Sequence, residues 1–132
     1  MERKVEFNSC GDTIRGVLHI PDGVKNPPLV IMAGGWCYVK EIVMPYYADD
    51  FMEIGCACLI FDYRRFGDSD GMPRQHINPW DQIEDYRNAI SYAQTLDEVD
   101  TDRIGVWGIS YSGGHAVCVA ALDTRVKFAL SV

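Results

Sequence analysis

The sequence has 132 residues, of which 48% are hydrophobic and 23% are charged, and its formal net charge at pH 7 is −7. This length and composition are typical of one globular domain with its own core. The negative charge argues against nucleic acid or an anionic membrane as a partner, because both are bound by basic faces. The longest apolar runs are only strand-sized, and residues 1–7 lack the apolar segment of a secretory signal, so we expect a cytoplasmic protein.

The sequence contains five cysteines, at positions 10, 37, 56, 58 and 118. A zinc site built on Cys56 and Cys58 would need a second thiol pair or histidines at ligand spacing, and none follows. We therefore expect reduced thiols in the protein core, with neither a metal nor another cofactor.

The first third of the chain predicts a hairpin and then a buried strand. Residues Lys4–Asn8 and Thr13–Ile20 alternate between apolar and polar side chains, with Gly11 and Asp12 expected at the turn. The uninterrupted apolar run Leu29–Met32 is typical of a parallel strand that is covered on both faces.

The middle third predicts two helices around a second buried strand. Residues Met44–Ile54 form the first helix, which Gly55 ends as a C-cap, and Ala57–Phe61 form the strand. The second helix starts at Asn78 and Pro79, an N-cap acceptor followed by the residue preferred at the first helical position.

An apolar stripe at helical spacing predicts which face of this second helix is buried. The stripe consists of Trp80, Ile83, either Tyr86 or Arg87, Ile90, Ala93 and Leu96. Four polar residues lie outside the stripe: Asp81, Glu84, Asp85 and Asn88.

The last third predicts a strand that ends at Trp107, a helix over Tyr111–Leu122 and a buried strand over Val126–Val132. Strands and helices thus alternate after the leading hairpin, which indicates an α/β fold with a mostly parallel sheet and helices on both faces. Ligands of such sheets bind beyond the carboxyl ends of the strands. Three segments lie there: Gly35-Trp36, Asp62–Asp70 and Ser110.

The strand-to-helix junction around Ser110 has the pattern of a nucleophile elbow. Such an elbow needs small residues two positions before and after the nucleophile, and here these are Gly108 and Ser112. Ser112 also has small neighbours and is the alternative nucleophile. It would draw Gly108 and Ile109 into a strand that ends naturally at Trp107, so we favour Ser110.

Attack by a serine places negative charge on the carbonyl oxygen of the substrate, and two preorganised donors must stabilise it. The first expected donor is the backbone N–H of Tyr111, in the first turn of the following helix. The second is the N–H of Trp36, where Gly34 and Gly35 let the backbone approach the substrate closely. We expect Gly35, Tyr38 and Phe66 to line the substrate pocket.

Three segments together resemble the α/β-hydrolase superfamily, with the dienelactone-hydrolase-like and polyketide-transferase-like branch as the most similar part. They are GISYSGG at 108–114, FDYRRFGDSDG at 61–71 and GGW at 34–36, the last followed by VKE at 39–41. Arg65 and Ser112 stand where this family more often has glycine, and Gly34 stands where it has histidine. Asp62, Asp68 and Asp70 are expected to order their loop by pairing with Arg64 or Arg65.

The resemblance implies that residues 1–132 are the N-terminal portion of a single α/β-hydrolase domain, truncated after about the sixth strand. It also implies that the catalytic acid and histidine follow later strands, so this chain alone would be inactive. Within the chain, His76 is the one histidine on a loop at the expected site and could be a substitute base. His115 is expected to be a packed or surface residue.

These observations predict a serine hydrolase or acyltransferase that acts on a small ester, thioester or lactone. The alternative is a non-catalytic binding or assembly module with the same fold. The expected partners are a small acyl substrate and either the missing C-terminal half or a second copy of the chain, because Val126–Val132 would otherwise form a bare apolar edge.

Overall fold

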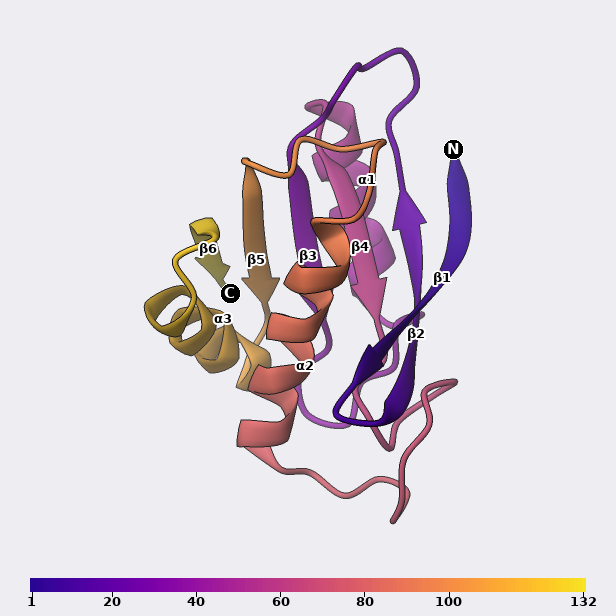
Figure 1. Ribbon diagram of the computed structural model, residues 1–132, viewed down its shortest axis with the longest axis vertical. Coiled ribbons are helices and arrows are strands. Elements are labelled where there is room, and N and C mark those ends of the chain that lie inside the picture. The colour runs from indigo at the N-terminus through magenta and orange to yellow at the C-terminus, as the bar shows by residue number, and fades with distance from the viewer.

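The computed structural model describes residues 1–132, which form one six-stranded sheet and three helices (Figure 1). The strands are β1 (Glu2–Ser9), β2 (Asp12–His19), β3 (Leu29–Ala33), β4 (Ala57–Phe61), β5 (Ile104–Gly108) and β6 (Val126–Ser131). The helices are α1 (Met44–Glu53), α2 (Pro79–Ala93) and α3 (Tyr111–Leu122).

The strands lie in the order β1-β2-β4-β3-β5-β6. The hairpin β1–β2 joins β4 in antiparallel fashion, whereas β4, β3, β5 and β6 are mutually parallel. Helices α2 and α3 cover one face of the sheet and α1 covers the other (Figure 1). The predicted α/β class, the mostly parallel sheet and the leading hairpin are therefore confirmed.

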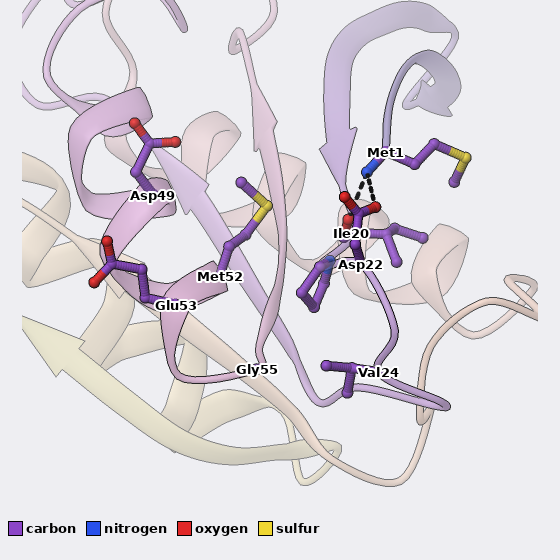
Figure 2. A pocket seen from close by; sticks show the side chains of 9 residues that line it. Met1, Ile20, Asp22, Val24, Asp49, Met52, Glu53 and Gly55 are labelled. Atoms are coloured by element: carbon purple, nitrogen blue, oxygen red, sulfur yellow. Dashed lines mark hydrogen bonds and ion pairs between the residues drawn. The ribbon is translucent and has the colours of Figure 1, made fainter.

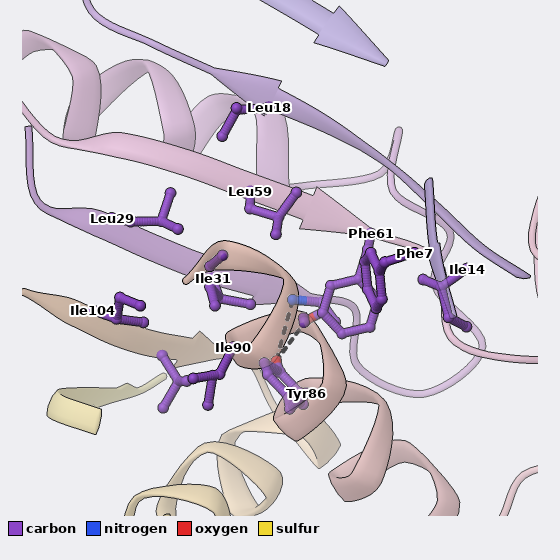
Figure 3. Close-up of a cluster of buried hydrophobic side chains, with 14 of the residues drawn as sticks. Phe7, Ile14, Leu18, Leu29, Ile31, Leu59, Phe61, Tyr86, Ile90 and Ile104 are labelled. Carbon is purple, nitrogen blue, oxygen red and sulfur yellow. Dashed lines mark hydrogen bonds between the residues drawn. The ribbon is translucent and has the colours of Figure 1, made fainter. Parts of the chain in front are cut away.

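Alternating side chains of the strands build two separate cores. Odd-numbered residues of β3 and β4 belong to a cluster of 24 buried residues under α2 and α3. Figure 3 shows Tyr86 and Ile90 of α2 pointing toward Ile31 and Leu59 in this cluster. Even-numbered residues of the same strands join a cluster of 7 under α1. This period of two explains why the runs in β3 and β4 are apolar throughout.

Several element boundaries differ from the prediction. The hairpin turn consists of Cys10 and Gly11 rather than Gly11 and Asp12, with φ of 52° and 93°. Two consecutive positive φ angles are those of a type I′ turn, whose twist matches that of the flanking strands. Helix α1 ends at Glu53, one residue earlier than predicted. The strand β6 lies at the sheet edge and is mostly exposed rather than buried.

Helix α2 starts as predicted, because Asn78 accepts hydrogen bonds from the backbone of Trp80 and Asp81. Its buried face also includes Gln82, Asp85 and Ala89, which lie outside the predicted stripe, and excludes Trp80. Trp80 is 68% exposed, since it lies in the first turn beyond the end of the sheet-covering stripe, whereas Asp85 is fully buried. Arg64 and Ser9 stabilise the Asp85 carboxylate, with contacts of 2.8 and 2.6 Å. Burial nevertheless raises the pKa of Asp85 to about 6.

The cysteines are less buried than predicted, because only Cys58 is fully inside, whereas Cys10 and Cys37 are exposed. No helix of the structure combines the length and the apolar character needed to cross a bilayer.

Candidate active site

Ser110 lies at the corner between β5 and α3. Its backbone has φ 56° and ψ −116°, a strained conformation for a residue with a side chain, and the residue is exposed. Gly108 makes the corner possible, because a Cβ at this position would overlap the carbonyl group of Ser112. The hydroxyl of Ser110 thus stands at the end of the sheet, outside the regular part of α3.

Ser112 has the opposite orientation and is fully buried. Its hydroxyl accepts a hydrogen bond from Ile109 N at 2.8 Å and lies 3.0 Å from the carbonyl oxygens of Ala33 and Ile109. This hydroxyl therefore links the corner to the end of β3 and is inaccessible to a substrate.

The loop after β3 packs directly against the corner. A Cβ built on Gly35 would lie 2.9 Å from Ile109 O and 3.6 Å from the Cβ of Ser110. The neighbouring Trp36 packs its ring edgewise on that of Tyr111, with the ring centroids 5.1 Å apart. The absence of a side chain at Gly35 thus lets this loop approach Ser110.

In the two segments that meet at this corner, the backbone N–H groups of Trp36 and Tyr111 have no acceptor within the chain, and neither do those of the other residues at 35–38. Tyr111 is the first residue of α3, where amides lack helical partners and the helix dipole favours negative charge. The structure therefore brings together Ser110, Trp36 and Tyr111, which the sequence places in two distant segments.

Two buried tyrosines brace the strand ends beneath this corner. Tyr86 donates to Trp107 O at 2.7 Å and accepts from Ala33 N at 3.1 Å, so it joins β5 to β3. Tyr63 donates to Gly34 O at 2.8 Å. Burial raises the pKa of both hydroxyls, which keeps them protonated as donors. The sequence analysis assigned neither residue to the site, because Tyr86 lies in an apolar stripe that is typical of core and Tyr63 lies in a polar loop.

The histidines of the chain do not contact the Ser110 hydroxyl. His115 is buried and its Nε2 lies 2.8 Å from Gln82 Oε1, while its ring packs edgewise on Tyr111. Burial lowers the pKa of His115 to about 4, so the imidazole is neutral at physiological pH. His76 is exposed on the loop before α2.

The remaining predicted pocket residues lie at different depths. Tyr38 is half-buried and packs against the glycines at 34 and 35. Phe66 belongs to the large core and also lines a hollow of about 510 Å³ with Cys37 and Arg74. That hollow borders the loop of Trp36 but does not include Ser110.

The carboxylates after β4 pair differently from the prediction. Asp62 and Asp68 bind Lys40, and Asp70 binds Arg15. Arg64 and Arg65 instead bind Asp85 and Asp81 of α2. The expectation that the three aspartates pair with Arg64 or Arg65 was therefore wrong, because it considered only partners within the loop.

Another hollow, of about 570 Å³, lies at the opposite end of the sheet. It is bounded by Asp49, Met52 and Glu53 of α1 and by the segments that precede β3 and β4 (Figure 2). These segments enter the amino ends of the parallel strands, so this hollow is separate from the Ser110 corner. No group of three or more His, Cys, Asp or Glu side chains in the structure could hold a metal ion.

Comparison with known proteins gives relatives along almost the whole chain. The chain is 42% identical to thiohydrolase aneE of Aspergillus aculeatus, covering 98% of the chain and 40% of that protein. It is 39% identical to the quorum-quenching protein AidA of Acinetobacter baumannii, covering 96% and 42%. The chain thus spans about 40% of the length of these curated relatives.

Solved structures and a family profile agree with this relationship. The α/β hydrolase GrgF from Penicillium sp. sh18 superposes with a TM-score of 0.90 at 33% identity, over 96% of this chain and 43% of that one. The profile of the X-Pro dipeptidyl-peptidase (S15) family matches residues 11–131. The resemblance to the α/β hydrolases is therefore confirmed, and the chain belongs to the S15 family within that superfamily.

Proposed function

We propose that this protein is a serine-dependent hydrolase or acyltransferase in which Ser110 attacks the carbonyl carbon of a small ester, thioester or lactone. The N–H groups of Trp36 and Tyr111 hold the oxygen that becomes negative. The observation that carries this proposal is the exposed hydroxyl at a positive-φ corner, flanked by two amides without acceptors.

The Ser110 hydroxyl needs a base to accept its proton, and no histidine of the chain is in contact with it. We propose that residues 1–132 are the N-terminal portion of a single domain and that the catalytic acid and histidine come from sequence beyond them. The relatives are more than twice as long as the matched region, which supports this. Sequencing the coding region after Val132 tests it directly. A continuation without an Asp or Glu and a His at later strand ends would contradict it.

A fluorophosphonate probe tests the nucleophile. In the protein that includes any downstream coding sequence, we expect stoichiometric labelling, with the adduct mapped to Ser110 by peptide mass spectrometry. Ser110→Ala should abolish labelling and leave the unfolding midpoint almost unchanged, because the side chain is exposed. The matched control is Ser91→Ala, which removes an exposed hydroxyl on α2 and should label like the unsubstituted protein. Labelling that persists in Ser110→Ala would reject the nucleophile.

A substrate panel separates the possible acyl groups. The thiohydrolase relative favours an acyl thioester, so we expect faster turnover of acyl thioesters than of the matching oxygen esters. The family profile makes an X-Pro dipeptide amide the necessary comparison. Preferential cleavage of that amide would overturn the thioester assignment but retain Ser110 as the nucleophile.

The second candidate is a non-catalytic binding or assembly module. It is favoured by the absence of any base bonded to the Ser110 hydroxyl within the chain. The probe distinguishes the two candidates. A folded protein that includes the downstream sequence and fails to react with fluorophosphonate supports the module.

A further inference from the structure

The loop that carries Trp36 is anchored at its two ends by consecutive residues that follow β4. At one end, Tyr63 donates a hydrogen bond to Gly34 O at 2.8 Å. At the other end, Lys40 N donates to Asp62 Oδ1 at 2.7 Å. Between these anchors, residues 35–38 form no hydrogen bond with the rest of the chain. The position of the Trp36 amide thus depends on the two anchors and on ring packing.

The Lys40 side chain strengthens the second anchor. Its Nζ donates hydrogen bonds to Asp62 Oδ2 at 2.8 Å and to Asp68 Oδ2 at 2.6 Å, and it forms an ion pair with Glu41 Oε1 at 2.8 Å. Burial lowers the pKa of Lys40, but its contacts with the three carboxylates outweigh burial and raise the pKa overall. Lys40 therefore remains charged.

Asp62 is the centre of this cluster and is almost completely buried. Besides the two bonds from Lys40, it accepts one from Asp68 N at 3.0 Å. Gly67 lets the second loop approach, because a Cβ there would overlap the Asp62 carboxylate. This carboxylate holds both loops in fixed positions, because a displacement of either loop would leave a buried charge or a backbone amide without its partner.

We infer that the Lys40–Asp62 pair positions the Trp36 N–H beside Ser110 and so sets the strength of the oxyanion site. Both are positioning residues, because they act on the site through the loop and not by contact with the reacting atoms. This inference rests on the proposed function, and it assigns a role to the Val39-Lys40-Glu41 segment.

A second buried ion pair supplies a matched control. Arg64 Nε lies 2.8 Å from Asp85 Oδ1, and these side chains are as buried as those of Lys40 and Asp62. This pair joins the β4 end to α2 and makes no hydrogen bond with residues 34–41. Arg64→Met therefore measures what the loss of an equally buried ion pair, one without a hydrogen bond to the loop, does to activity.

The experiment compares Lys40→Met with Arg64→Met in the catalytically competent protein, at a temperature where circular dichroism shows both folded. For Lys40→Met we expect kcat and the rate of fluorophosphonate labelling to fall about tenfold or more, with KM within about twofold, since an oxyanion donor acts on the transition state. A trifluoromethyl ketone analogue should bind more weakly by the same factor. Lys40→Arg, which retains the charge, should recover part of the rate.

The inference is overturned if Lys40→Met labels as fast as Arg64→Met, or if its loss appears in KM alone. If Lys40→Met does not fold, the double variant Lys40→Met/Asp62→Asn is used in its place, because it also removes the buried charge that has lost its partner. Its labelling rate is then compared with that of Arg64→Met. If the unsubstituted protein does not label, the proposed function itself fails and this inference falls with it. The two hypotheses therefore fail in different experiments: the nucleophile in the unsubstituted protein, and the positioning role of Lys40 and Asp62 in the comparison of variants.

Discussion

Ser112 shows how one buried hydroxyl connects two elements of the site. This hydroxyl joins the corner to β3 through Ile109 and Ala33. Removal of the hydroxyl leaves the half-buried N–H of Ile109 and the buried carbonyl of Ala33 without this partner. Ser112→Ala should therefore destabilise the protein by about 1–3 kcal/mol, measured as the free energy of unfolding in urea. A change within experimental error would mean that water replaces the hydroxyl.

Gly35 is the residue at which the two halves of the site approach each other most closely. Gly35→Ala adds a Cβ 2.9 Å from Ile109 O, so the loop must move away from Ser110. We expect kcat to fall by about one order of magnitude or more, because a displaced donor no longer reaches the developing charge. The measurement is the labelling rate together with kcat.

Gly114→Ala is the control for this substitution. A Cβ at Gly114 meets nothing within 4 Å, and the residue lies inside α3. Alanine is favoured over glycine inside a helix, so the variant should gain up to about 1 kcal/mol of stability. Equal losses of activity in the two variants would show that the corner tolerates no change at all and would remove the special role of Gly35.

At the scale of elements, the contact between α2 and α3 makes stability depend on pH. His115 on α3 is buried against Gln82 on α2, and burial lowers the pKa of its imidazole to about 4. In the unfolded chain the imidazole has its ordinary pKa of about 6.5. The stabilising contribution of neutral His115 is therefore complete above pH 6.5. This contribution, at most about 3 kcal/mol, is lost as the pH falls from 6.5 toward 4.

His115→Gln tests this dependence, because an amide keeps the hydrogen-bonding capacity but has no proton to gain. Free energies of unfolding at a series of pH values should converge for the two proteins as the pH falls from 6.5 to 4. Carboxylates such as Asp85 titrate in both proteins, so their contribution to the pH dependence cancels in the difference between the two unfolding free energies. Parallel curves would show that the imidazole of His115 has the same pKa in the folded and unfolded states, which would contradict the lowered pKa.

The elements with a strong local signal were predictable from the sequence. The bounds of α3 and the N-cap of α2 agree with the prediction, because Asn78-Pro79 and the Gly108–Gly114 pattern act within one turn of the chain. The placement of Ser110 at a corner follows from the same local pattern. Uninterrupted apolar runs also predicted the covered strands β3 and β4, whereas the same interpretation was wrong for β6.

Partners that lie far apart in the sequence were not predictable. Lys40 reaches Asp62 across 22 positions, and Arg64 reaches Asp85 across 21, and no spacing rule connects such residues. Asp85 lies outside the apolar stripe, so its burial becomes clear only when the arginine that neutralises it is known. The one-residue shift of the hairpin turn has a different cause, since Cys10 adopts a positive φ that residue preferences disfavour.

At the scale of the whole molecule, the sheet ends in an edge strand, β6, that no other element covers on its outer side. Strand β6 pairs with β5 on one side only, and both Leu130 in this strand and Val132 directly after it are exposed. An uncovered apolar edge offers unpaired backbone groups to another strand. Purified residues 1–132 should therefore self-associate in a concentration-dependent manner, measured by sedimentation velocity.

Leu130→Lys should reduce this self-association, because a charge on an edge strand opposes pairing. The control is Ile54→Lys, which places a charge at a more exposed apolar residue beyond the end of α1. If Ile54→Lys reduces association as much as Leu130→Lys, the effect is one of net charge and not of the strand edge.

The two anchors of the Trp36 loop also limit where residues can be inserted into or deleted from the chain. Asp62 and Tyr63 are consecutive, and side chains along an extended chain alternate in direction. One codon inserted after Phe61 would turn both side chains to the wrong side, and the carboxylate would no longer meet Lys40. Insertions and deletions should therefore be tolerated further along, in the exposed stretch around His76, and not at the end of β4.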